Sequence, residues 1–159
     1  MNSCSPFCPE ENVRGGFLNP PLIAATSAAL LTLVPIAAHQ LGLLDHLPDP
    51  ASWVFDSDRI TDSASAHPLG IPDSLLGLGS YGLTLTLAVL AHRHQRAKKL
   101  LGLKLVADGS VAGINVVKQV VSFRRLCSWC TGTAICTAAM VFAGRNLIRQ
   151  GGSRLRAEV

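Results

Sequence analysis

Three stretches of this chain lack charged side chains for long enough to cross a lipid bilayer. Residues 15–38, 74–91 and 126–144 contain no Asp, Glu, Lys, Arg or His, and a membrane-spanning helix needs about 20 mostly apolar residues. Pro35 is compatible with the first stretch, because helices in lipid re-satisfy a freed carbonyl. Only 15% of the residues are charged, against about 25% in soluble domains. The sequence therefore predicts an integral membrane protein.

A fourth apolar stretch, residues 100–121, is interrupted by Lys104 and Asp108. These side chains are four residues apart, so a helix would place them on one side, facing each other. We interpret them as an ion pair near the membrane surface or inside a bundle, in preference to a proton relay. An interfacial position for this stretch would leave three spans and export the C-terminal arginines, so four spans are favoured.

The charges of the connecting segments predict the topology. Residues 39–73 are acidic, whereas basic residues gather before, between and after the other spans: Arg14, Arg93, Arg96, Lys98, Lys99, Arg145, Arg149, Arg154 and Arg156. Because basic loops stay in the cytoplasm, both termini are expected there, in the inner membrane of a bacterium. The short turn with Lys118, Arg124 and Arg125 is an exception. Nucleic-acid binding is not expected, since the basic residues do not cover one face.

This topology divides the chain into three parts. We expect a cytoplasmic tail over residues 1–19, an all-α membrane domain over 20–145 and a basic cytoplasmic tail over 146–159. The spans within the domain are placed at about 20–38, 74–91, 100–121 and 126–144. The first span is taken as an uncleaved helix, because Glu10 and Glu11 precede it and no small-residue cleavage site follows it.

Cys127 and Cys130 form a C-x-x-C motif at the start of the last span. Residues three apart in a helix share a face, within reach of a disulfide. Free N–H groups in the first turn and the preceding Arg124 and Arg125 would stabilise a thiolate. The chain offers no second C-x-x-C or His pair to complete a zinc site. Redox chemistry at the membrane boundary is therefore favoured over two cysteines that only pack as small hydrophobic residues.

Two sequence runs carry a resemblance to a known family. The run LCSWCTGTAICTAAM (126–140), preceded by VVKQVVSFRR, resembles the redox helix of the vitamin K epoxide reductase family. The run HPLGIPDSLLGLGSY (67–81) is similar to the family's signature, a Gly-x-Pro loop followed by a small residue, Gly and Tyr. The resemblance implies a four-helix membrane bundle around a quinone of the ubiquinone or menaquinone type, with the C-x-x-C at its extracytoplasmic end.

The resemblance also implies roles for particular residues. Cys130 would face the quinone, and Cys127 would exchange disulfides with a partner thiol. In a C-x-x-C at a helix start, the first cysteine is also expected to be the more exposed, and the second, one turn deeper, to be better placed for the quinone. The residues that match the quinone-capping signature are Gly70, Pro72, Asp73, Ser74, Gly77 and Tyr81. Trp129 could wall the same site. From the residues alone, Asp73 is equally well explained as a helix N-cap, and Gly77, Gly79 and Gly82 as points of close helix approach.

The sequence departs from the family in its first extracytoplasmic loop. Typical members carry a further cysteine pair there, which relays electrons from a thioredoxin-like partner, but residues 39–73 contain no cysteine. Ser57 lies near the expected position of one of that pair. Cys4 and Cys8 are in the N-terminal tail, on the opposite side of the membrane under four spans. Direct exchange between Cys127 and a thioredoxin-like protein or a small thiol remains chemically feasible.

Two functions are consistent with these features. The first is a membrane thiol:quinone oxidoreductase, which forms disulfides while it reduces quinone. The second is a non-catalytic membrane subunit, or a quinone- or lipid-binding protein, that keeps the fold without the relay. We expect Cys136 only to pack. His39, His46 and His67 flank the acidic loop, but their spacing matches no metal motif, so no metal site is assigned.

Overall fold

The computed structural model describes residues 19–149 of the chain. Its elements are α1 (Pro20–Gln40), α2 (Ser57–Thr61), two 3-10 turns (Ala64–Ala66 and Pro68–Gly70), α3 (Asp73–Leu90), α4 (Gln95–Lys118), the π-helical turn η3 (Gln119–Phe123) and α5 (Ser128–Ala143). The described residues contain no β-strand. The predicted all-α architecture is therefore confirmed.

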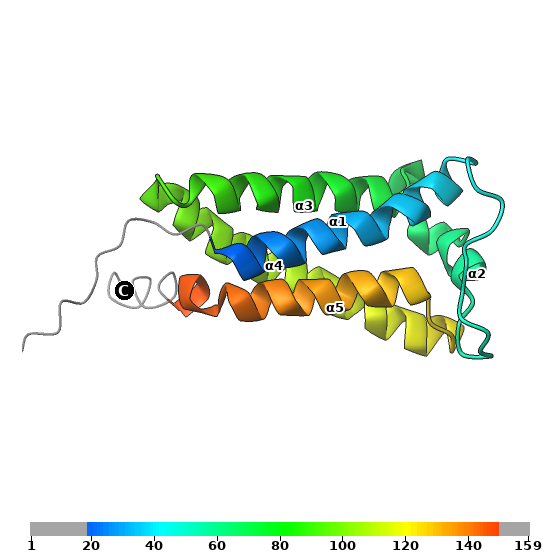
Figure 1. The fold of residues 1–159 in the computed structure, drawn as a ribbon. Coiled ribbons are helices and arrows are strands. Elements are labelled where there is room, and N and C mark those ends of the chain that lie inside the picture. The colour runs from blue at the N-terminus through cyan, green and yellow to red at the C-terminus, as the bar shows by residue number, and fades with distance from the viewer. Residues whose placement is uncertain (1–18, 150–159) are drawn as a thin grey trace, which may run out of the picture.

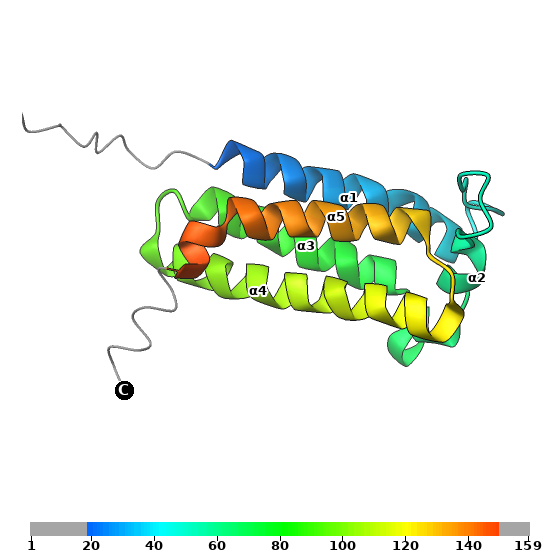
Figure 2. The same ribbon diagram turned by 90° about the horizontal axis from the view of Figure 1, so that it is seen from below.

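Four long helices lie alongside one another and form a bundle (Figures 1 and 2). Helix α1 packs against α3 and α5, and α4 packs against the same two helices. Glycines set two of these close approaches: a Cβ on Gly77 of α3 would stand 3.0 Å from Cδ1 of Leu33 on α1, and one on Gly109 of α4 would stand 3.0 Å from Cγ2 of Val141 on α5. No such neighbour lies within 4 Å of Gly79 or Gly82. Of the three glycines interpreted as packing points in α3, only Gly77 is one.

Among the described residues, three helices are long and apolar enough to cross a membrane: α1, α3, and α4 together with η3. Helix α5 has 16 residues, or about 24 Å at 1.5 Å per residue, and helical structure resumes over residues 145–149. The helices begin and end close to the expected segments. The main difference is that α4 begins at Gln95, five residues before the predicted span, because its basic first turns are helical as well.

The surface of the bundle is apolar where a lipid chain would contact it. Leu31, Leu103 and Val121 are 70%, 70% and 71% exposed, respectively, whereas Thr26, Thr84 and Thr137 are buried. A soluble protein has the opposite distribution, with apolar side chains inside and polar ones outside. The distribution found here is the one expected of membrane-spanning helices, since lipid tails accept apolar side chains and polar groups must find partners inside the bundle.

The two ends of the bundle differ in charge. The acidic segment 41–72 and the connection between η3 and α5 lie at one end (Figure 1, right). The start of α1, the basic turn between α3 and α4, and the end of α5 lie at the other end (Figure 1, left). The tail residues Cys4, Cys8, Arg14, Arg154 and Arg156 fall outside the described residues.

Lys104 and Asp108 form an ion pair inside the bundle. Asp108 also accepts hydrogen bonds from the hydroxyls of Ser80 at 3.0 Å and Thr84 at 2.8 Å, both on α3. The Lys104 ammonium donates to Ser80 as well, at 2.7 Å. Of the two positions considered for this pair, the structure has the one inside the bundle, where the four polar groups join α3 to α4.

The Lys104→Met variant should be markedly less stable than the wild type. Without the ammonium, the Asp108 carboxylate is left buried without a countercharge, and breaking a buried pair in this way costs about 3 kcal/mol. The double variant Lys104→Met/Asp108→Leu should recover much of this loss, because no charge is then left unpaired. Unfolding in detergent micelles measures both. A single variant as stable as the wild type, or a double variant as unstable as the single one, would contradict this role.

Candidate functional site

The cysteine motif lies where the chain turns from α4 into α5. Arg124 adopts the left-handed conformation, with φ at 51°, and thereby ends η3 and reverses the chain. Cys127 is the N-cap of α5, and its Sγ accepts a hydrogen bond from the Cys130 N–H at 3.1 Å. The two residues form a disulfide, with their Cα atoms 5.2 Å apart. Helical spacing therefore brings the two sulfurs together at the N-terminus of α5.

The two cysteines differ in exposure, and in the opposite sense to the one expected. Cys127 is 0% exposed, whereas Cys130 is partly exposed and lines a cavity between the bundle helices and the loop. The prediction that the first cysteine is the more exposed is wrong for this structure. The reason is that residues 48–57 lie over the start of α5 and cover Cys127, which a helix considered alone does not reveal.

Asp49 fastens this covering segment to α5. Its carboxylate accepts hydrogen bonds from the Ser57 hydroxyl at 2.6 Å, the Ser57 N–H at 2.7 Å and the Ser128 hydroxyl. The Ser128 N–H donates in turn to Ser57 Oγ at 3.1 Å. Ser57 is 0% exposed. The serine at the position where a relay cysteine was considered therefore contacts the residue next to Cys127 through hydrogen bonds.

Backbone contacts extend the same cover. Phe55 and Leu126 form an isolated parallel bridge, with the Leu126 N–H 2.9 Å from the Val54 oxygen. Arg125 donates to the Trp53 carbonyl at 2.7 Å. The Trp129 indole N–H donates to the Pro48 carbonyl at 3.1 Å. Arg125 is thus engaged with the covering segment.

Histidines and aspartates hold the remainder of the loop. His39 Nε2 lies 3.1 Å from Asp62, and His46 Nδ1 lies 3.0 Å from Asp58. Partial burial raises the pKa of the Asp58 carboxyl, but the Leu47 N–H and the two nearby imidazoles lower it by more, so this pKa lies below its ordinary value. Within the described residues no group of three or more His, Cys, Asp or Glu side chains could hold a metal. These histidines therefore act as partners of loop carboxylates.

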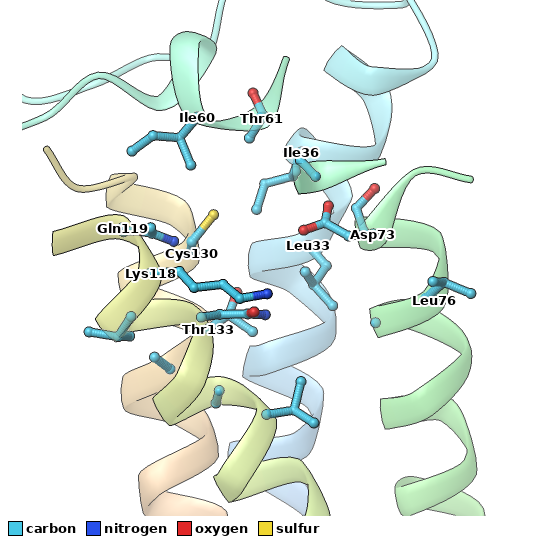
Figure 3. A pocket seen from close by; sticks show the side chains of 18 of the residues that line it. Leu33, Ile36, Ile60, Thr61, Asp73, Leu76, Lys118, Gln119, Cys130 and Thr133 are labelled. Carbon is cyan, nitrogen blue, oxygen red and sulfur yellow. The ribbon is translucent and has the colours of Figure 1, made fainter. Parts of the chain in front are cut away.

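A cavity of about 400 Å³ lies beside the disulfide, lined by residues of the bundle helices and of the loop, and it is partly open to the surface (Figure 3). Its walls combine apolar side chains, among them Leu33, Ile36 and Leu76, with polar ones from α3 and α4. The residues predicted from the signature that line it are Asp73, Ser74, Gly77 and Tyr81, and Cys130 lies on the same wall as Gln119. The volume is within the range of small-molecule sites.

The other three predicted residues are not among those that line the cavity. Gly70 has φ at +78° and ends the second 3-10 turn, a backbone conformation that favours glycine. Pro72 is the N-cap residue of α3, without a side-chain cap bond. Trp129 is directed to Pro48. The structure thus places these three around the site, as parts of its frame.

Asp73 and Ser74 are held by Gln40, at the end of α1. The Gln40 amide nitrogen donates to Asp73 at 3.0 Å and to the Thr61 carbonyl at 3.2 Å, and its oxygen accepts from the Ser74 hydroxyl. Asp73 is the first residue of α3 and does not cap it, so the alternative interpretation as an N-cap is not realised. Ser74 already uses its proton within the protein.

Tyr81 lies deeper in the bundle. Its hydroxyl is 2.6 Å from that of Thr137, and Thr137 donates to the Thr133 carbonyl at 2.8 Å. The Thr137 proton is therefore in use, and Tyr81 is the donor of the pair. This hydrogen bond fixes the ring against α5.

Three residues of the site were missed by the sequence reasoning: Gln40, Asp49 and Gln119. No local motif marks them, because each acts on a residue far away in the sequence. For Gln40 and Gln119, the one available signal was that a polar side chain stands at the edge of an apolar stretch. Such residues are costly in a membrane and are commonly functional.

The comparisons with known proteins agree with this architecture. The model of the vitamin K epoxide reductase family matches residues 20–144, from the start of α1 to the end of α5. A comparison with curated proteins finds no match. Because the family match covers most of the chain, including every bundle helix, the cavity and both cysteines, this protein belongs to the vitamin K epoxide reductase family.

Proposed function

We propose that this protein is a membrane thiol:quinone oxidoreductase in which Cys127 and Cys130 cycle between dithiol and disulfide. Family membership and the three apolar helices establish an integral membrane protein, and the family implies thiol and quinone chemistry at a general level. The observation that carries the proposal is that Cys130 is in disulfide contact with Cys127 and also lines the 400 Å³ cavity.

The proposed reaction balances without a metal. In the quinone half, the Cys127 and Cys130 thiols form the disulfide, and their two electrons and two protons convert one quinone to one quinol. In the thiol half, a substrate dithiol attacks the disulfide, passes through a mixed disulfide and leaves oxidised. The net result is one disulfide made in the substrate for each quinone reduced.

The two cysteines take different roles in this scheme. Cys130 faces the cavity and is therefore assigned to the quinone. Cys127 is assigned to the partner thiol, and its Sγ is the better stabilised as a thiolate, because it accepts the Cys130 N–H at the N-terminus of α5. Asp73, Ser74, Gly77 and Tyr81 shape the quinone site, with Gly70, Pro72 and Trp129 as its frame.

The covering segment sets a condition on the thiol half of the reaction. With Cys127 completely buried, a thioredoxin-like protein or a small thiol reaches it only after the Asp49 hydrogen bonds open. Because segment 39–73 contains no cysteine, no relay through this loop is available. The partner must therefore meet Cys127 directly.

The burial of Cys127 also favours a second candidate function. A family member without loop cysteines and with a sealed disulfide could serve as a non-catalytic membrane subunit or as a quinone- or lipid-binding protein. In that case the disulfide would have only a structural role, linking the N-cap of α5 to its first turn. Turnover measurements distinguish this candidate from the oxidoreductase.

The orientation proposed for the chain follows the charges at the two ends of the bundle. The basic turn between α3 and α4 and the end of α5 would lie in the cytoplasm, together with both termini. The acidic loop and the C-x-x-C would face the extracytoplasmic side of the inner membrane. There, an oxidising compartment would supply thiol substrates.

Purified protein supplied with a quinone and a dithiol should reduce the quinone. Cys130→Ala should abolish this activity, because no sulfur is then left on the cavity wall, while Cys136→Ala should retain it as the matched control. Quinone absorbance follows the reaction. Absence of cysteine-dependent turnover would reject the oxidoreductase in favour of the non-catalytic function.

Loosening the cover should expose the thiol of Cys127. In a Cys130→Ala background, Asp49→Ala should increase the rate at which a chromogenic disulfide reagent modifies Cys127 by roughly tenfold or more, because three hydrogen bonds to the carboxylate are lost. Asp45→Ala is the control, an exposed aspartate in the same acidic segment. Equal rates for the two variants would show that the cover does not limit access.

The orientation can be tested by labelling intact cells with a membrane-impermeant thiol reagent. A Trp53→Cys variant that lacks Cys127, Cys130 and Cys136 should react from outside, since Trp53 is 80% exposed in the covering segment. Cys4 and Cys8 should react only after the cells are permeabilised. Labelling of the tail cysteines in intact cells would overturn the four-span orientation.

A further inference from the structure

We propose that Gln119 donates the hydrogen bond that holds a quinone oxygen beside Cys130, an inference that rests on the proposed function. Gln119 is the first residue of the π turn η3, it is 6% exposed, and it lines the cavity together with Cys130. Its role is to position the ring against the sulfur that passes electrons to it.

Gln119 lies at the point where α4 ends and the π turn η3 begins. A π turn widens a helix by one residue and commonly occurs at functional sites. Here the Gln119 side chain accepts a hydrogen bond from the Cys127 N–H at the start of α5. Figure 3 shows the side chain extending from η3 toward Cys130, with its nitrogen on the cavity side.

One hydrogen bond fixes which end of the amide faces the cavity. The Cys127 N–H lies 3.0 Å from Gln119 Oε1, and a backbone N–H can only donate, so the oxygen must face it. The Nε2 amino group is then directed away from the backbone. Within the described part of the chain it has no hydrogen-bond acceptor, and it is not sealed from the cavity.

The other buried polar groups of the cavity are poorly suited to bind a carbonyl. Asp73 and Asp108 already serve as acceptors, and a quinone carbonyl can only accept. The lining hydroxyls donate within the protein: Ser74 to Gln40, Ser80 to Asp108, Thr61 to the Ser57 carbonyl, Thr133 to the Trp129 carbonyl. Asn115 and Lys118 also line the cavity, and Figure 3 shows the Lys118 side chain extending into it, but both residues are exposed, whereas Gln119 is buried beside Cys130. Gln119 is therefore the buried donor that a ring oxygen would find next to the disulfide.

This arrangement links the ligand to the redox pair. One amide group holds the Cys127 backbone with its oxygen and the quinone with its nitrogen. A donor aimed at the ring oxygen stabilises the negative charge that develops there as electrons arrive. Gln119 is thus a positioning residue for both halves of the site.

Quinone binding to two Gln119 variants separates this role from a purely structural one. Gln119→Glu keeps an acceptor for the Cys127 N–H and replaces the amino group by a second acceptor, whereas Gln119→Met removes both functions at similar volume. Ser110→Ala is the matched control, because Ser110 is exposed on α4 and donates only to the Val106 carbonyl. The probe is a short-chain ubiquinone analogue, and its Kd is read from the quenching of tryptophan fluorescence in detergent.

The expected result is a Kd about tenfold higher for Gln119→Glu at neutral pH, since a donor is lost and an acceptor faces the ring oxygen. The disulfide and the unfolding temperature should stay as in the wild type. Gln119→Met should weaken binding at least as much, and Ser110→Ala should bind as the wild type does. An unchanged Kd in Gln119→Glu would overturn the proposal, as would a wild type that binds no quinone. If Gln119→Glu does not fold, an unchanged Kd in Gln119→Met overturns it.

The outcome for Gln119 can be distinguished from the outcome for the proposed function. Binding that depends on Gln119 without cysteine-dependent turnover would support the inference and reject the oxidoreductase. Turnover with the same Kd and KM in Gln119→Glu and the wild type would support the oxidoreductase and reject Gln119.

Discussion

The carboxylate of Asp49 is the contact on which the redox end of this molecule depends. It accepts hydrogen bonds from the Ser57 hydroxyl, the Ser57 N–H and the Ser128 hydroxyl. These hydrogen bonds hold an acidic loop over the first turn of α5. With this contact in place Cys127 is sealed, and the disulfide communicates only with the cavity through Cys130. The same hydrogen bonds that complete the fold therefore separate the cavity side of the disulfide from its loop side.

The membrane interior imposes a second constraint, which shapes the cavity. Polar side chains away from water must be paired, and this bundle pairs them across helices: Gln40 holds Asp73 and Ser74, Asp108 holds Lys104, Ser80 and Thr84, and Tyr81 donates to Thr137. These pairings use up most donors on the cavity wall. On the buried part of the wall, the amino group left over on Gln119 gives the cavity a preferred orientation for a ligand that only accepts hydrogen bonds.

Local features of the sequence predicted much of this structure. Charge-free stretches fixed three of the four bundle helices to within a few residues at most ends, and the three-residue spacing of Cys127 and Cys130 predicted a pair within disulfide reach. Four residues of the signature run line the cavity: Asp73, Ser74, Gly77 and Tyr81. The long-range contacts were not predictable: nothing near Asp49 in the sequence indicates Ser128, and the π turn that begins at Gln119 has no sequence motif. The burial of Cys127 was missed for the same reason, since it is caused by a loop about 70 residues away in the sequence.

The central claim is that the disulfide between Cys127 and Cys130 exchanges electrons with a membrane quinone. The most direct measurement is the redox state of these two cysteines in native membranes, trapped by acid and read by the mass shift of a thiol label, with the quinone pool either intact or depleted. The account predicts that the pair is oxidised when quinone is present and accumulates as dithiol when the pool is depleted. A pair whose redox state is the same in both membranes would contradict it.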